Sequence, residues 1–216
     1  MTLQLYYAPG ACSFVPHALL EIAGVPFEPK LVKLHKGEQS SPEYLALNAR
    51  GQVPVLVDDG AVITQIVAIV NYINDKYAGG KFLPTDPLEK AKALELLAWF
   101  NNSVHPTFTH VFMPHKFSAD KNTHTELQSF NTALFRGQLT EIDALCAKAQ
   151  PWIGGADIGP LDLYALTLMR WGGFVGLDPK GWAHLWPHAN KVAQHPAVAK
   201  AVAREKLDLD VKPVKA

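Results

Sequence analysis

The chain of 216 residues has little cysteine and no excess of either charge. Its two cysteines, Cys12 and Cys146, lie in very different contexts, so no disulfide-stabilised scaffold is expected. Lys plus Arg and Asp plus Glu number 20 each, and this balance argues against nucleic acid or an anionic membrane as the main partner. No apolar run approaches the roughly 20 residues of a membrane helix, and Met1 leads directly into the first expected strand without a signal-like region. We therefore expect a cytoplasmic protein that does not enter a membrane.

Motifs for nucleotides, metal ions and dithiol chemistry are also missing. Neither GxGxxG nor GxxxxGK[ST] occurs, so no nucleotide site is expected. His105, His110 and His115 are five residues apart, which turns successive side chains by about 140° on a helix, so we expect no metal site. A C-x-x-C motif from Cys12 would need cysteine at Val15. Any redox chemistry at Cys12 would therefore use a single thiol and an external partner.

The most informative stretch is residues 1–16. Leu3–Tyr6 alternates apolar and polar residues as a half-buried strand does, Pro9-Gly10 predicts a turn, and helical spacing of apolar residues begins at Ser13. Cys12 is thus expected at or just before the first turn of a helix, where free N–H groups and the helix dipole favour a thiolate. We interpret Cys12 as a functional thiol with a lowered pKa. A small buried cysteine is the alternative.

The rest of the first half predicts an α/β unit, and the second half predicts helices alone. Strands are expected at Leu3–Tyr6, Phe27–Leu34, Val53–Val57 and Ala61–Thr64, and helices from Ser13, from Ser41 and from Gln65 to Tyr77. Beyond the Gly- and Pro-rich segment 79–87, helices are expected at about 88–105, 126–149, 161–171, 181–193 and 196–205. Pro106 must bend or interrupt the first of these. We therefore divide the chain into an α/β domain (1–78), a linker (79–87) and an all-helical domain (88–216).

The helix expected from Leu161 begins with a capping pattern. Gly159-Pro160 supplies the cap and a proline at the first helical position, and Asp162 can accept a hydrogen bond from the N–H of the cap residue. We interpret Asp162 as structural rather than catalytic. Cys146 lies on the apolar face of its helix and is interpreted as core.

Taken together, these segments resemble a glutathione S-transferase, most closely the bacterial beta class. The resemblance covers essentially the whole chain and is carried by YYAPGACS, LNARGQVPVLVDDGAVITQ, VAIVNYI and the helix from Asp162 to Arg170-Trp171. It implies a glutathione transferase fold, with a thioredoxin-like glutathione-binding domain followed by an all-α domain. It also implies glutathione as co-substrate without a metal ion, and a homodimer.

The resemblance also implies the roles of individual residues. Cys12 and His105 match the catalytic cysteine and histidine near the glutathione sulfur. The glutathione-binding residues are expected to be Lys36, Gln52, Val53, Pro54, Gln65, Ile66 and Asn102, with a cis-proline at Pro54 and Asn102 reaching across the dimer. From position alone, an electrophile pocket is expected at Phe14, Phe108 and Phe112.

Two positions depart from the family pattern. Ile66 stands where serine, threonine or glycine usually follows the acid or glutamine, so it offers the γ-glutamyl carboxylate only its backbone N–H at a helix start. Ala98 stands where beta-class members often carry asparagine. Both changes concern glutathione affinity rather than the fold.

We expect a detoxification transferase that conjugates glutathione to small hydrophobic electrophiles. Two alternatives remain open. One is a monothiol, glutathione-dependent disulfide reductase or peroxidase that works through Cys12. The other is a non-catalytic binding or regulatory protein with a transferase fold.

Overall fold

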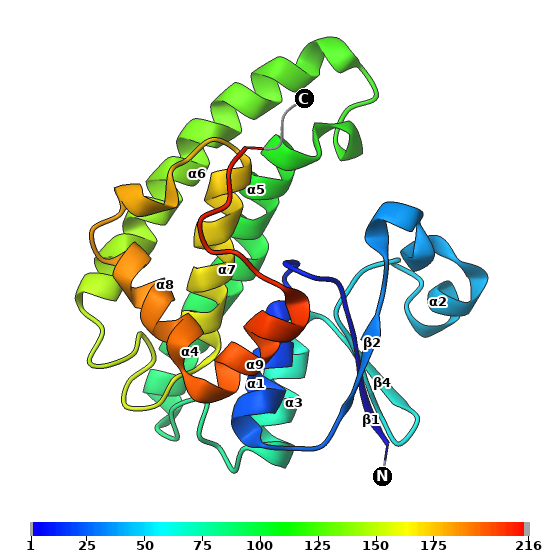
Figure 1. The fold of residues 1–216 in the computed structure, drawn as a ribbon, viewed down its shortest axis with the longest axis vertical. Coiled ribbons are helices and arrows are strands. Elements are labelled where there is room, and N and C mark those ends of the chain that lie inside the picture. Colours follow the sequence, from blue (N-terminus) through cyan, green and yellow to red (C-terminus); the bar gives the residue numbers. More distant parts are fainter. Residues whose placement is uncertain (1, 214–216) are drawn as a thin grey trace. The chain divides into compact units, whose positions relative to one another are not determined.

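The computed structural model describes residues 2–213 and divides into two compact units (Figure 1). The first unit holds the described residues up to Lys90 together with Ala193–Leu207. The second holds Ala91–Val192 and the described residues from Asp208 onward. The assignment of Ala193–Leu207 to the first unit was not foreseen from the sequence. The division into 1–78, 79–87 and 88–216 stays a prediction.

The first unit is built on a four-stranded sheet with the strand order β2-β1-β3-β4. The strands are β1 (Leu3–Tyr7), β2 (Glu28–Leu31), β3 (Val55–Asp58) and β4 (Ala61–Thr64). β1 runs parallel to β2 and antiparallel to β3, and β3 forms a hairpin with β4. The expected alternation holds in β1, where every second side chain from Leu3 to Tyr7 is buried.

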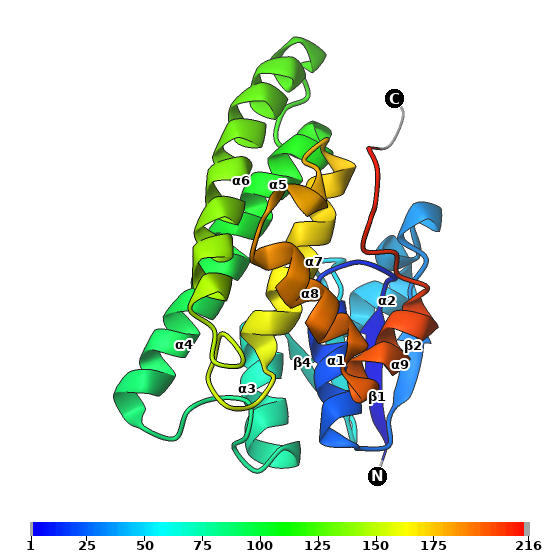
Figure 2. The ribbon, with the colours of Figure 1, turned by 60° about the vertical axis from the view of Figure 1, so that its left-hand side comes forward.

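Helices pack against this sheet. They are α1 (Phe14–Ala23), α2 (Pro42–Leu47), α3 (Ile66–Tyr77) and, from the end of the chain, α9 (Pro196–Glu205). α1 contacts both α3 and α9, and Figure 2 shows α9 beside α1. α1 ends at Gly24, whose φ of 67° is the left-handed conformation that glycine adopts without strain. Helix α2 begins as expected, because the Ser41 side chain accepts a hydrogen bond from the Tyr44 N–H.

The second unit is helical, with no strand among its described residues beyond an isolated bridge between Trp152 and Gly155. Its helices are α4 (Pro87–Trp99, which begins in the first unit), α5 (His105–Phe112), α6 (His124–Ala147), α7 (Pro160–Phe174) and α8 (Leu185–Gln194). A π-helical turn, Phe100–Val104, joins α4 to α5. It is the interruption expected from Pro106, which has no N–H to offer the carbonyl four residues earlier. No helix of the described chain is long and apolar enough to cross a bilayer.

Helix α7 is buried on all sides, and Asp162 starts it as predicted. One carboxylate oxygen of Asp162 accepts the Gly159 N–H at 2.9 Å, which closes the capping pattern. The other accepts the Ile153 N–H at 2.9 Å and lies 2.8 Å from Nε2 of His188. The carboxylate therefore joins the preceding loop and α8 to the start of α7.

Candidate functional site

Three chain segments meet at one end of the sheet in the first unit. Tyr6 of β1 and Thr64 of β4 both pair with Val55, the first residue of β3. The loop that follows β1, the Val53-Pro54 turn that precedes β3 and the start of α3 after β4 therefore lie at the same edge. This edge gathers most of the residues expected to bind glutathione.

Cys12 lies in the loop after β1, two residues before α1 begins at Phe14. Its side chain is 8% exposed, and its S–H donates to the Val53 carbonyl oxygen across 3.6 Å. The Val53-Pro54 peptide bond is cis, as the sequence allowed. The structure thus brings together Cys12 and the turn that carries the cis-proline, as expected.

The expectation that the pKa of Cys12 is lowered is wrong. Burial raises the pKa of this thiol to about 12, and the negative charge of Glu205 acts in the same direction. The backbone N–H groups of Cys12 and Ser13 oppose this increase without overcoming it. The amides of the helix start are thus present, but removal of water from the thiolate outweighs them. Cys12 is a neutral thiol at pH 7.

The loop that carries Cys12 is held by buried hydrogen bonds. The hydroxyl of Ser13 accepts the Ala8 N–H at 3.1 Å and donates to the Ala8 carbonyl at 3.2 Å. The Gly10 N–H donates to one carboxylate oxygen of Glu205 at 2.9 Å, and the other oxygen lies 2.6 Å from Nδ1 of His17. Sequence reasoning missed Glu205 and His17 because they are 188 positions apart. The only local signal is a glutamate at the end of an amphipathic helix.

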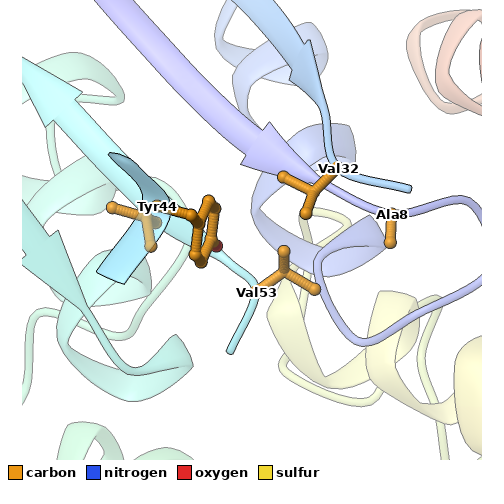
Figure 3. Close-up of a cluster of buried hydrophobic side chains, with 5 residues drawn as sticks. Ala8, Val32, Tyr44 and Val53 are labelled. Carbon is orange, nitrogen blue, oxygen red and sulfur yellow. The ribbon is translucent and has the colours of Figure 1, made fainter. Parts of the chain in front are cut away.

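An apolar cluster holds the Val53-Pro54 turn on its other side. Figure 3 shows Val53 lying between Tyr44 and Ala8, with Val32 close by. The Tyr44 hydroxyl donates to the carbonyl of Gln52 at 2.9 Å. The backbone of Val53, which the resemblance pairs with the cysteinyl part of glutathione, is therefore fixed by packing and by a hydrogen bond to the preceding residue.

The N-terminus of α3 is open for an anion. Gln65 is exposed and has a φ of 71°, which is rare for a residue with a side chain, and no side chain caps the helix within the described structure. The first helical hydrogen bond runs from the Ile69 N–H to the Gln65 carbonyl, so residues 66–68 point their N–H groups out of the helix start. The side chain of Ile66 is only 2% exposed, and its N–H remains for a ligand.

The other residues expected to bind glutathione lie apart from this edge or on the other unit. Lys36 is exposed in a 3₁₀ turn, Leu34–Lys36, and Gln52 is exposed beside Val53. Asn102 is exposed on the π-helical turn of the second unit, and it accepts a hydrogen bond from the Asn101 amide at 2.8 Å.

His105 opens α5 in the second unit. Its Nδ1 lies 2.9 Å from the Tyr164 hydroxyl, and its ring meets Trp171 edge-on with centroids 4.6 Å apart. Burial lowers the pKa of His105 to about 4, and the positive charge of Lys116 contributes. The imidazole is therefore neutral at pH 7 and acts as a base or hydrogen-bond partner rather than as a cation.

Aromatic rings continue from Trp171 along α5. Phe108 stacks on Trp171 with centroids 4.6 Å apart and on Phe112 at 5.2 Å. Phe112 is 43% exposed, so the row of rings reaches the surface of this unit. Phe14, the third residue of the expected electrophile pocket, is fully buried on α1 in the first unit and has the least structural support of the three.

Comparison with known proteins identifies the family. Residues 1–75 match the glutathione S-transferase N-terminal domain. "Glutathione S-transferase GstA" of Escherichia coli O157:H7 is 31% identical over 213 residues, covering 95% of this chain and all of the relative. The chain belongs to the glutathione S-transferase family.

Two solved transferases share the fold over their whole length. A sphingomonad glutathione S-transferase complexed with glutathione is 28% identical, with a TM-score of 0.81 over 95% of this chain and all of that one. The bacterial beta class glutathione S-transferase of Sphingomonas chungbukensis is 26% identical, again with a TM-score of 0.81 over 95% of this chain and all of that one. The glutathione transferase fold and the likeness to the beta class, both expected from the sequence, are confirmed.

Proposed function

We propose that this glutathione S-transferase family member conjugates glutathione to small hydrophobic electrophiles. We further propose that it resembles the beta class in working as a cytoplasmic homodimer in detoxification. The observation that carries the proposal is the open N-terminus of α3 beside Cys12 and the Val53-Pro54 turn. Unbonded amides at a helix start suit the γ-glutamyl carboxylate, which is the part of glutathione that Ile66 leaves without a hydroxyl partner.

The rest of the tripeptide follows the family pattern along the same edge. The side-chain oxygen of Gln65 accepts from the γ-glutamyl ammonium group, and the backbone of Val53 pairs with the cysteinyl unit. Lys36 faces the glycyl carboxylate, and Asn102 comes from a second copy of the chain. His105 lies in the second unit, and the family likeness, rather than a distance, connects it with the glutathione sulfur.

The protonation states favour conjugation over a monothiol reductase. A reductase that works through Cys12 needs its thiolate, and burial raises the pKa of that thiol to about 12. In conjugation, glutathione supplies the sulfur. Cys12 can then donate its S–H to the glutathione thiolate, while a neutral His105 accepts the proton that the thiol loses.

Row-forming aromatic rings support a hydrophobic electrophile. Phe108, Phe112 and Trp171 form a stacked apolar surface in the second unit. Planar aromatic substrates gain offset stacking on such rings in addition to apolar burial. We therefore place aryl halides and other conjugated electrophiles first among the substrates to be tried.

Thermal unfolding with two thiol ligands tests the carrying observation. Glutathione at about 100 times its Kd should stabilise the fold by about 2.7 kcal/mol. Cysteinylglycine, which keeps the thiol but lacks the γ-glutamyl unit, should give little shift at the same concentration. No shift with millimolar glutathione would contradict the proposed function. Equal shifts with both ligands would show that the start of α3 does not carry the binding.

Activity with an aryl halide, set against activity with a small disulfide, separates the alternatives. We expect conjugation of the aryl halide, and we expect Cys12→Ala to retain part of it because glutathione provides the nucleophile. Turnover of the disulfide alone, lost in Cys12→Ala, would establish the monothiol reductase instead. Glutathione binding without either activity would indicate the binding protein. Light scattering should report twice the 23.7 kDa chain mass.

A further inference from the structure

Three polar side chains form a hydrogen-bonded chain inside the second unit. His105 begins α5, Asn101 lies one turn earlier on the π-helical turn, and Tyr164 faces both from the middle of α7. Nδ1 of His105 lies 2.9 Å from the Tyr164 hydroxyl. That hydroxyl donates to Oδ1 of Asn101 at 3.2 Å. Tyr164 is fully buried, so its hydroxyl is held where the two other groups meet.

The direction of this chain is set at Asn101. Its amide nitrogen donates to Oδ1 of Asn102 at 2.8 Å, which leaves its carbonyl oxygen toward Tyr164. A carbonyl oxygen can only accept, so the single proton of the Tyr164 hydroxyl goes to Asn101. The hydroxyl must then accept a hydrogen bond from His105, and Nδ1 of His105 must carry a proton.

A neutral imidazole has one ring proton, so its location on Nδ1 determines the other nitrogen. Nε2 of His105 keeps its lone pair, and no hydrogen bond to Nε2 forms within residues 2–213. The rings of Trp171 and Tyr164 lie at 63° and 79° to the imidazole and fix its plane from two directions. The lone pair is therefore on a defined atom with a defined orientation. Free histidine favours the opposite tautomer, with the proton on Nε2.

We propose that Tyr164 and Asn101 are positioning residues that hold His105 in its Nδ1-protonated tautomer, so that Nε2 accepts the proton of the glutathione thiol. The inference rests on the proposed function for the identity of that thiol. In the reaction, the S–H bond of glutathione breaks and its proton goes to Nε2 as the sulfur forms its bond to the electrophile. The leaving group, a halide ion for an aryl halide, departs with the electron pair of the broken carbon–halogen bond. The imidazolium then returns its proton to solvent.

Nitrogen NMR measures the tautomer without reference to activity. Histidine labelled with ¹⁵N and observed through two-bond ¹H–¹⁵N correlation at pH 7 distinguishes the protonated ring nitrogen from the one with a lone pair. The His105 signals are assigned from their loss in His105→Gln. We expect the protonated signal at Nδ1. A protonated Nε2 in the unsubstituted protein would overturn the proposal.

Variants then test the two positioning residues. Tyr164→Phe removes one oxygen, and Asn101→Leu removes the acceptor from a partly exposed site, so one variant remains informative if the other folds poorly. Both should move the His105 proton toward Nε2. Asn101→Asp, which can only accept, should keep the native tautomer. Tyr72→Phe is the matched control, because Tyr72 also loses a hydroxyl hydrogen bond, to Asp58 at 2.7 Å, but lies in the first unit. An unchanged tautomer in both Tyr164→Phe and Asn101→Leu would refute the positioning role.

Kinetics separates this proposal from the proposed function. If the chain conjugates an aryl halide, Tyr164→Phe should lower kcat by about 10- to 100-fold and leave KM for glutathione unchanged, since a misplaced proton impairs the base rather than binding. Asn101→Asp should restore most of the rate that Asn101→Leu loses. An unchanged kcat in Tyr164→Phe would overturn the positioning role. Absence of conjugation in the unsubstituted protein would instead overturn the proposed function, while the NMR result still decides the tautomer.

Discussion

At the scale of single residues, the environment rather than the residue type sets the chemistry. The position of Cys12 near a helix start favours a thiolate, and the structure does supply backbone N–H groups there. Burial of the same sulfur removes the water that would solvate the charge, and this effect is larger. His105 shows the same physics with the opposite charge, because burial opposes its protonated form.

Cys12 should therefore react slowly with alkylating agents in the folded protein. At pH 7, a thiol whose pKa is about 12 is ionised in only about one molecule in 10⁵, against a few per cent for a free thiol. We expect iodoacetamide to label Cys12 and Cys146 at the free-cysteine rate only after unfolding in urea, as followed by mass spectrometry. Rapid labelling of native Cys12 below pH 7, abolished in Cys12→Ala, would contradict this.

His105 should make the fold sensitive to acid. Its folded pKa of about 4 lies below the unfolded value of about 6.5, so the unfolded chain binds the proton more readily. The stability from a neutral His105 is complete above pH 6.5 and is lost as the pH falls toward 4. Urea unfolding at pH 7 and pH 4.5 should show a smaller loss of stability in His105→Gln than in the unsubstituted protein. Equal losses in both proteins would count against a depressed pKa.

At the scale of elements, the sequence predicts those parts that local rules decide. The helix at Pro196–Glu205, the hairpin from β3 to β4 and the cap at Asp162 all follow from nearby residues. The expected strand Phe27–Leu34 is shorter in the structure, Glu28–Leu31, because β2 is an edge strand that pairs only with β1. Pro106 predicted an interruption but not its form, a π-helical turn.

The candidate site shows the same limit. The sequence placed Cys12, the Val53-Pro54 turn and the start of α3 correctly because each belongs to a local motif that the sheet register then brings together. It did not predict Glu205 under the Cys12 loop or Tyr164 beside His105. These contacts depend on which helices pack together, and no local pattern encodes that.

Asp162 should be among the most costly positions to truncate. Asp162→Ala leaves the N–H groups of Gly159 and Ile153 without an acceptor in a buried place, so we expect a loss of about 2–4 kcal/mol in urea unfolding. Asp143→Ala is a matched control. The Asp143 side chain also accepts two backbone N–H groups, of His184 and Leu185, but it is only partly buried, and about 1 kcal/mol is expected. Equal losses would show that burial does not matter here.

At the scale of the whole molecule, neither unit is a continuous segment. Helix α9 closes the first unit against α1, where Glu205 meets His17 with both side chains fully buried. The last described residues return to the second unit, where Arg170 donates to the Asp208 carbonyl. A substituent at Gly173 would lie 2.3 Å from the Val211 carbonyl oxygen, so a glycine on α7 makes room for this tail.

Glu205→Ala should therefore affect the N-terminal loop. It leaves Nδ1 of His17 and the Gly10 N–H without a partner, and we expect a loss of about 3 kcal/mol. Native Cys12 should become more reactive toward iodoacetamide, because its loop is held less firmly. Glu141→Ala, at an exposed position of α6, is the control and should change neither quantity. Unchanged Cys12 labelling in Glu205→Ala would show that α9 does not hold the loop.

The return of α9 has a consequence for synthesis of the chain. The sheet and α1 leave the ribosome first, but the glutamate that completes their packing is translated 115 residues after Lys90. At roughly 5–20 residues per second, the nascent N-terminal unit waits on the order of 10 seconds with His17 uncovered and the loop of Cys12 incompletely bonded. The unit made first is thus the one finished last, and its maturation is a post-translational event.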